Sequence, residues 1–189
     1  MLITQEFYVL VTGDTTTPSA DVTEAVDEAT TLVGDQLDRH LVSASRVEVV
    51  AIHRDGRAYP KAAPVTVAPA GAEIDPLMGG FALRWVTPDD VTVVTGYWTQ
   101  THPPFATITY TGGYGEAFAA PPCPRPLARC IAQLAHALAV GVPVSAPAGA
   151  TSVRLGDAGV TFAIPLSDLD ELVPGITARL RPYRRVEYA

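Results

Sequence analysis

The sequence predicts an α+β protein: a small helical bundle with an inserted antiparallel β region. Three observations support this prediction. Apolar residues recur at helical spacing between residues 21 and 41, and again between residues 127 and 138. Between these stretches, residues 46–112 contain short runs rich in Val, Thr and aromatic residues, separated by Pro, Gly and Asp. We therefore expect two long amphipathic helices and short terminal helices around a β-rich insert.

Residues 1–42 predict two helices. Thr4 is placed to cap a short helix through QEFYVLV, which Gly13 would end. A longer helix follows, and Asp21 with Glu24 gives a capping-box pattern at its start. We expect it to end near His40. Its apolar positions are Val22, Ala25, Val26, Ala29, Leu32, Val33, Leu37 and Leu41.

The insert, residues 46–112, changes to a pattern of short extended runs. RVEVVAIHRDGRAYP contains two of them on either side of Asp55-Gly56, a dipeptide typical of a tight hairpin. APVTVAP, GFALRW, DVTVVTGYWT and FATITYT follow, and each is too short for a helix. The middle third should therefore form a small antiparallel sheet.

A second long helix is expected over residues 124–141. Pro126 suits its first turn, and Gly141 and Pro143 would end it. Its apolar face consists of Leu127, Cys130, Ile131, Leu134, Ala135 and Leu138. The two long helices would pack as the scaffold of a single domain over residues 1–189. The core residues expected at this contact are Val26, Val33, Leu37, Ile131, Leu134 and Leu138.

Residues 152–189 predict a hairpin, a short helix and a tail. SVRLGDAGVTFA would turn between its two glycines, and Ser167 would cap a helix through Leu169, Leu172 and Ile176. The tail ARLRPYRRVEYA combines arginines with tyrosines, which supply planar donors and rigid contact area. We interpret it as a contact with an acidic protein surface. Its candidate residues are Arg179, Arg181, Tyr183, Arg184, Arg185 and Tyr188.

Composition favours a chain that buries surface against partners. Hydrophobic residues make up 48% of the 189 residues and charged residues only 17%, so we expect a homo-oligomer. The formal net charge of −7 argues against binding nucleic acid by neutralising phosphates. No stretch of 18 apolar residues and no signal peptide are present, which indicates a soluble cytoplasmic protein.

The sequence contains no pattern of a phosphate, metal or cofactor site. Gly112, Gly113 and Gly115 lack the Lys of a phosphate-binding loop, and we read them as glycines that let the chain turn beside a packed Tyr110 or Tyr114. Cys123 and Cys130 fit neither a disulfide framework nor a zinc site, so we expect reduced, buried thiols. The four histidines are scattered singly: His40, His53, His102 and His136.

Catalytic residues are not expected either. No nucleophile motif occurs, and the acidic run SDLDE is better explained as helix capping than as a calcium loop. We therefore expect a protein that is not an enzyme and that has no catalytic residue, cofactor or metal. The alternative from a different functional class is a small ligand-binding or enzymatic α+β domain. Such a domain would need convergent polar groups in a pocket.

The order of elements resembles the head-to-tail connector proteins, or adaptors, of long-tailed double-stranded DNA phages. The resemblance is carried, in order, by ITQEFYVLVTGD, ADVTEAVDEATTLVGDQLDRHL, ATITYTGGYG, PRPLARCIAQLAHALA, SVRLGDAGVTFA and LRPYRR. It covers nearly the whole chain.

The resemblance implies a virion structural protein without enzymatic activity. Family members form a ring, usually of twelve copies, beneath the portal; it joins the filled capsid to a tail-side stopper or neck protein and lets the genome pass without sequence-specific binding. C-terminal segments dock into the portal in relatives, so the six tail residues named above become portal-interface candidates. The implied location is the virion neck, with assembly in the host cytoplasm. The alternatives are a stopper or tail-completion protein and a DNA-binding adaptor.

Overall fold

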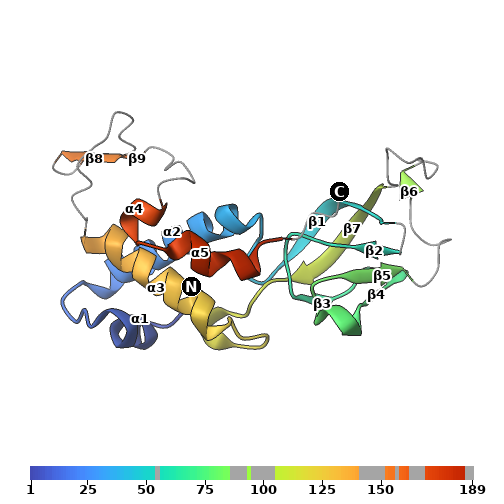
Figure 1. Cartoon of the computed structure of the whole chain (residues 1–189), viewed down its shortest axis with the longest axis horizontal. Coiled ribbons are helices and arrows are strands. Elements are labelled where there is room, and N and C mark those ends of the chain that lie inside the picture. Colours follow the sequence, from blue (N-terminus) through green and yellow to red (C-terminus); the bar gives the residue numbers. More distant parts are fainter. Residues whose placement is uncertain are drawn as a thin grey trace. The chain divides into compact units, whose positions relative to one another are not determined.

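The computed structural model describes residues 1–53, 56–85, 93–94, 105–140, 152–155, 158–161 and 169–185. These residues form helices and small antiparallel sheets, which confirms the predicted α+β class (Figure 1). The chain divides into two compact units. The sheet unit comprises Met1–Leu2, Asp38–Cys123 and Arg184–Ala189, and the helical unit comprises Ile3–Leu37 and Pro124–Tyr183. The expected single domain stays a prediction.

Helix α1 (Gln5–Thr12) has the ends that the sequence predicts. The Thr4 hydroxyl accepts a hydrogen bond from the Phe7 amide at 3.2 Å, which satisfies one of the unpaired amides at the helix start. Gly13 ends the helix with φ 73°, in the left-handed region. The predicted cap and stop are both confirmed.

Helix α2 (Ser19–Leu37) begins and ends earlier than expected. The Val22 amide donates to the Pro18 carbonyl at 3.0 Å, so Asp21 lies inside the first turn and the predicted capping box is wrong. The helix ends because Asp38 adopts φ 51°. Leu41 is buried outside the helix, in the sheet unit, and does not extend the helical face as predicted.

Helix α3 (Arg125–Val140) includes Pro126 in its first turn, as predicted, and packs against α1 and α2. Five of the six expected core residues are buried, with exposed fractions of 1% or less: Val26, Val33, Leu37, Ile131 and Leu134. Leu138 is half-buried. Which of these side chains touch one another stays a prediction.

The C-terminal part of the helical unit contains two short helices instead of one. Helices α4 (Leu169–Leu172) and α5 (Ile176–Leu180) are separated at Pro174-Gly175, where Gly175 has φ 74°. The expectation of one helix reaching Ile176 is therefore wrong. A 3-10 turn, η4 (Arg181–Tyr183), follows α5.

The predicted C-terminal hairpin is present. Strands β8 (Ser152–Leu155) and β9 (Ala158–Thr161) pair antiparallel, with Ser152 opposite Thr161. The predicted cap Ser167 lies outside the described residues.

Within its described residues the sheet unit contains two antiparallel sheets, where the sequence predicted one. The larger sheet has the order β1-β7-β3, with β6 also paired to β7. The smaller has the order β2-β5-β4. Their strands are β1 (Ala44–Ala51), β2 (Arg57–Ala58), β3 (Val65–Val67), β4 (Ala72–Ile74), β5 (Leu83–Trp85), β6 (Val93–Val94) and β7 (Phe105–Gly112).

A tight turn follows β1, but it does not join a hairpin. The His53 amide donates to the Arg57 carbonyl at 2.8 Å, and Gly56 has φ 76°. The flanking strands belong to different sheets, because β1 pairs with β7 and β2 pairs with β5. The predicted β1–β2 hairpin is therefore wrong, and Asp55 lies outside the described residues.

One apolar cluster joins the two sheets. Inward-facing residues of β1 and β7, such as Val50 and Ile108, are buried together with Ala58 of β2 and Leu83 of β5. Side chains alternate along a strand, so the other faces of β1 and β7 point away from this core. The face of β1 and β7 that does not carry these cluster residues is therefore the exposed face of the larger sheet.

Candidate functional site

The outer face of β1 and β7 is an exposed surface without charge. Six side chains alternate with the buried ones, and we call them the outer strip: Ser45, Val47, Val49, Phe105, Thr107 and Thr109. Val47 lies opposite Thr109 and Val49 opposite Thr107. Val47 is 70% exposed and Val49 62% exposed, values that are high for two valines on one strand. An uncharged face that exposes two valines and a phenylalanine among hydroxyl side chains suits a protein–protein contact.

The register of this face is held by a polar network on the inner side of β1. The Tyr110 hydroxyl donates to Glu48 Oε2 at 2.6 Å and accepts from the Ala62 amide at 3.0 Å. Glu48 also accepts from the Lys61 amide at 3.0 Å. Burial raises the pKa of Tyr110, and its hydrogen bond to Glu48 adds to this effect. A slip by one residue would break the network and turn the valines inward.

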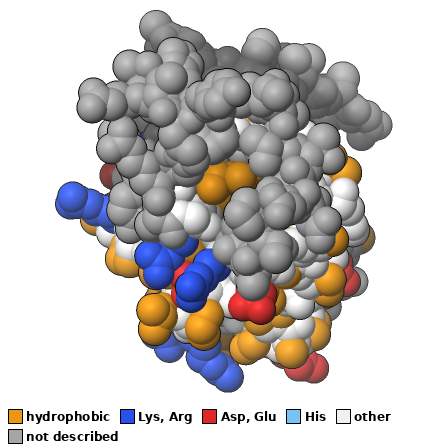
Figure 2. All heavy atoms as spheres, turned by 90° about the vertical axis from the view of Figure 1, so that its right-hand side faces the viewer, with side chains coloured by type: hydrophobic (Ala, Val, Ile, Leu, Met, Phe, Trp, Pro, Cys, Tyr) orange, Lys and Arg blue, Asp and Glu red, His pale blue; other side chains and the backbone are white. Residues whose placement is uncertain are grey.

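A second exposed apolar feature follows β4. The 3-10 turn η1 (Pro76–Met78) carries Leu77, which is 84% exposed. We call residues 75–80 the Leu77 turn; it is the short green helical turn beneath β3 in Figure 1. Figure 2 shows the sheet unit from the right-hand side of Figure 1; among the described residues there, hydrophobic side chains lie beside basic and acidic ones.

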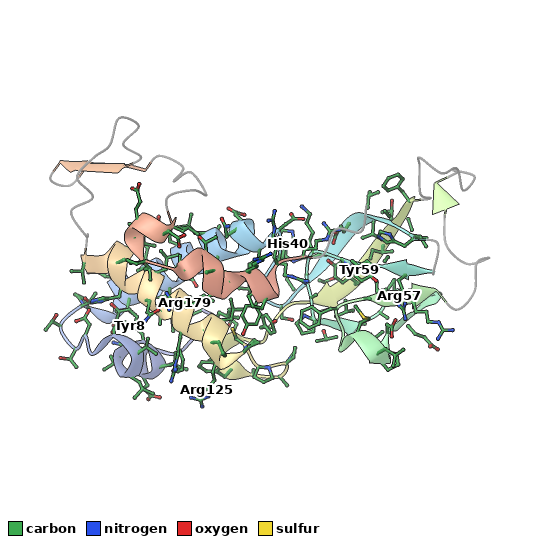
Figure 3. The ribbon with its side chains drawn as sticks, viewed as in Figure 1. Tyr8, His40, Arg57, Tyr59, Arg125 and Arg179 are labelled. Carbon is green, nitrogen blue, oxygen red and sulfur yellow. The ribbon has the colours of Figure 1, made fainter. Side chains whose placement is uncertain are left out.

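Hydrogen bonds to Asp75 and Gly80 hold the Leu77 turn in place. Asp75 is 2% exposed; its carboxylate accepts from the Leu77 amide at 2.9 Å and from Arg57 Nε at 2.5 Å. The hydrogen bond from Arg57 (labelled in Figure 3) is the main reason why the pKa of Asp75 lies below its usual value. The Val65 amide donates to the Gly80 carbonyl at 2.7 Å, which ties the turn to β3. A partly buried ion pair thus supports the turn that carries the exposed leucine.

The C-terminal arginines differ in what they contact. Arg185 donates to the Tyr59 carbonyl through Nε at 3.1 Å and Nη2 at 2.8 Å, and through Nη1 to Asp38 at 3.0 Å. Arg179 donates to Gln133 at 2.6 Å within the helical unit. Arg181 and Arg184 are exposed.

The two tyrosine candidates of the tail are placed differently. Tyr183 is half-buried, and Tyr188 lies outside the described residues. The six tail residues that the sequence grouped together therefore have different surroundings in the structure. The ion pair between Arg185 and Asp38, which are far apart in the chain, was not predicted.

The glycine-rich loop after β7 is a packing feature. A Cβ at Gly112 would lie 2.1 Å from the Ala62 carbonyl oxygen, and one at Gly115 would lie 2.5 Å from that of Ala119. Gly113 has φ 108° and is just as crowded. Tyr110 and Tyr114 are buried beside these glycines. The interpretation of the glycines as a turn beside packed tyrosines is confirmed.

A polar cluster in the helical unit was missed by sequence reasoning. The Tyr8 hydroxyl (Figure 3) lies 3.1 Å from Asp14 Oδ2 and 3.1 Å from His136 Nδ1. Asp14 also accepts from Thr17 Oγ1 at 2.5 Å and from the Thr16 amide at 2.8 Å. These hydrogen bonds, that from Thr17 first, hold the pKa of Asp14 well below its usual range. Burial raises the pKa of Tyr8 to about 12.

The remaining histidines do not gather into a site. His53 contacts Tyr59 edge to face, with ring centroids 5.3 Å apart. Burial lowers the pKa of His40, and His102 lies outside the described residues. Within the described ranges no group of three or more His, Cys, Asp or Glu side chains could hold a metal ion.

Both cysteines are free and buried, as predicted. Burial raises the pKa of Cys123 to about 12, which makes it an inert thiol. Asp170, in the acidic run, lies in the first turn of α4, as predicted, and its carboxylate also accepts from the Thr177 amide at 2.9 Å at the start of α5. None of the described helices is long and apolar enough to cross a membrane.

Solved structures of similar fold come from gene transfer agent particles. A chain from the neck of an empty gene transfer agent particle, computed with C6 symmetry, aligns with a TM-score of 0.51 and 18% identity. A chain from the virion of a native gene transfer agent particle aligns with a TM-score of 0.53 and 18% identity. Each alignment covers 97% of this chain and 89% of the other. At this identity the likeness concerns the fold.

Sequence comparison finds no counterpart: no protein-family model matches the chain, and no curated protein matches it significantly.

Proposed function

We propose that this chain is a structural protein of the neck of a phage-like particle. The observation that carries the proposal is the fold likeness to a gene transfer agent neck chain over 97% of this chain. The order of sequence elements, which resembles phage connectors, supports the same function independently. A fold alone does not define a function. Here the fold likeness and the order of sequence elements favour the same function, and the exposed outer strip suits a protein that contacts other copies.

Within the neck, the finer proposal is a head-to-tail adaptor: a ring, of twelve copies in the family it resembles, beneath the portal and above a stopper or neck protein. The outer strip supports it, since a subunit in a closed ring needs apolar surface for its neighbours. The proposal includes a passive channel through which DNA moves without specific binding. The net charge of −7 favours passage over adhesion. No catalytic role is proposed.

Portal binding is assigned to the exposed part of the arginine-rich tail. Arg181 and Arg184 are exposed and available to an acidic surface, whereas Arg185 is occupied by Asp38 and the Tyr59 carbonyl. Deleting residues 179–189 is therefore a poor test, because it would remove Arg185 and the buried Leu180 together with the contact.

The test is a charge reversal in the intact chain. Arg181→Glu with Arg184→Glu should reduce capture by tailless, DNA-filled capsids at least about tenfold, because two attractive contacts become repulsive. Arg129→Glu, an exposed arginine on α3, is the matched control and should bind as the wild type does. Electron microscopy of the particle neck then shows whether the protein lies beneath the portal. A particle whose neck lacks this chain would overturn the proposal.

A further inference from the structure

Two exposed apolar features lie at opposite edges of one sheet. The order of the larger sheet is β1-β7-β3, so the outer strip covers the edge strand β1 and the adjoining central strand β7. The Leu77 turn lies beyond β3 at the other edge, because Val65 of β3 bonds to Gly80 of the turn. Strand β3 therefore lies between the two features within one copy of the sheet unit, and they form two different patches.

The chemistry of the outer strip limits what can cover it. It contains two valines, a phenylalanine, two threonines and a serine. A nucleic acid would find no positive charge there, and a charged peptide would lose water without gaining a counter-charge. The partner surface should therefore be apolar and uncharged, with a side chain that fits between β-branched residues. Apart from the buried carboxylate of Asp75, the Leu77 turn has this chemistry, and its backbone at Leu77 is held by Asp75, which is paired with Arg57.

We propose that the Leu77 turn of one copy binds the outer strip of the next copy, in a contact that repeats from copy to copy. Two different patches at opposite edges form a heterologous contact, which closes into a ring or continues as a chain, whereas a two-fold contact would use the same patch on both copies. Each copy carries a net charge of −7, so close approach between copies is easiest where both surfaces are uncharged. The inference rests on the proposed function, which requires contacts between identical copies.

Two single variants test the two halves of the contact by sedimentation velocity at several concentrations. Leu77→Asp and Val47→Asp should each raise the dissociation constant for self-association about 30-fold or more, because each buries an unpaired charge at the centre of the contact. Val47→Lys should do the same, since either sign of charge is unpaired there. Leu10→Asp is the matched control: Leu10 is 75% exposed, lies on α1 and should leave self-association unchanged.

Mixing the two variants is the decisive experiment. A Val47→Asp copy keeps its Leu77 turn and a Leu77→Asp copy keeps its outer strip, so the mixture should form heterodimers and nothing larger. Circular dichroism and urea unfolding confirm that each variant is folded. Assembly of Leu77→Asp like the wild type, absence of heterodimers in the mixture, or a wild type that is monomeric at every concentration would overturn the inference.

These outcomes are separate from those for the proposed function. If Leu77→Asp assembles like the wild type and the chain is still found in the particle neck, the contact is wrong and the function stands. If the mixture forms heterodimers but the neck lacks the chain, the contact stands and the function is wrong.

Discussion

Buried titratable side chains give individual residues a measurable effect on stability. Cys123 is 2% exposed, and its pKa rises from 9.0 to about 12, while that of Tyr8 rises from 10.0 to about 12. Burial also raises the pKa of Cys130. The folded state holds each of these protons more tightly than the unfolded chain does. Their contribution is therefore complete below the unfolded pKa and is lost as pH rises toward the folded value.

We expect the free energy of unfolding to fall above pH 9, first through the cysteines and above pH 10 also through Tyr8. Urea unfolding at a series of pH values measures this. Replacing both Cys123 and Cys130 with alanine should flatten the curve between pH 9 and pH 10 while leaving the decline above pH 10. A double variant that loses stability between pH 9 and pH 10 as steeply as the wild type would contradict the assignment.

Tyr110 is the residue that connects β7 to Glu48 and to the Ala62 amide. Tyr110→Phe should lower the free energy of unfolding by about 1–3 kcal/mol, because the Ala62 amide loses its partner inside the sheet unit. Thr107→Val removes an exposed hydroxyl from the opposite face of the same strand and serves as the control, with an expected change below about 0.5 kcal/mol. Equal effects of the two variants in urea unfolding would refute the role of the network.

At the scale of elements, the ends of strands and helices depend on whether a neighbour approaches. Gly112 ends β7 where the Ala62 carbonyl leaves no room for a Cβ, whereas Gly13 ends α1 in open space. Both are glycines at the end of an element, yet the first is required by contact and the second by its φ of 73°. This difference separates two kinds of glycine that look alike in the sequence.

Gly112→Ala should therefore cost about 3 kcal/mol or more, since the backbone of residue 62 must move. Gly13→Ala should cost about 1–2 kcal/mol, the price of a left-handed conformation for a residue with a Cβ. Comparing the urea midpoints of the two variants with the wild type gives both values. If Gly112→Ala proved the milder change, the close approach of residues 62 and 112 would be wrong.

At the scale of the whole molecule, the C-terminal chain contributes to both compact units. Ile176 and Leu180 are fully buried in the helical unit, and Arg185 is bonded within the sheet unit. Burial of an aliphatic side chain of this size stabilises by about 1.5–3 kcal/mol. The tail is thus partly structural, and a portal contact must use what lies exposed on it.

Truncation should separate the structural part of the C-terminal segment from its exposed part. Ending the chain after Arg185 keeps α5 and every described contact of Arg185, so this protein serves as the reference. Ending it after Gly175 should lower it by several kcal/mol, since two buried side chains and the Arg185 tie are lost. Thermal and urea unfolding of the two truncated proteins measure the effect, and equal stability would contradict a structural role for α5.

Much of the fold could be predicted because the patterns are local. The helical spacing that defines α2 and α3, the cap at Thr4 and the stop at Gly13 depend on residues within a few positions of each other. The C-terminal end of α2 was misplaced because Asp38 takes φ 51° beside Lys61 and Arg185, which are distant in sequence.

The candidate site was largely beyond sequence reasoning. Alternation shows that β1 has two faces, but both contain valine, so burial of Val50 and exposure of Val47 are decided by the second sheet. Strand β4 and the Leu77 turn were not predicted, since three-residue elements give too little periodic signal. The exposure of Leu77 depends on the turn that the Asp75 carboxylate holds, and no local pattern predicts that turn.

The sequence by itself determined the α+β class, the two long helices with their buried faces, the free and buried cysteines and the glycine-rich turn, because each follows from local spacing and side-chain chemistry. Only the tertiary structure decided that β1 and β2 belong to different sheets, that Arg185 binds within its own chain, and that an uncharged strip and a fixed leucine lie at opposite edges of one sheet. The physical reason is that pairing, burial and ion pairs between residues far apart in the chain are set by packing, which a linear pattern does not encode.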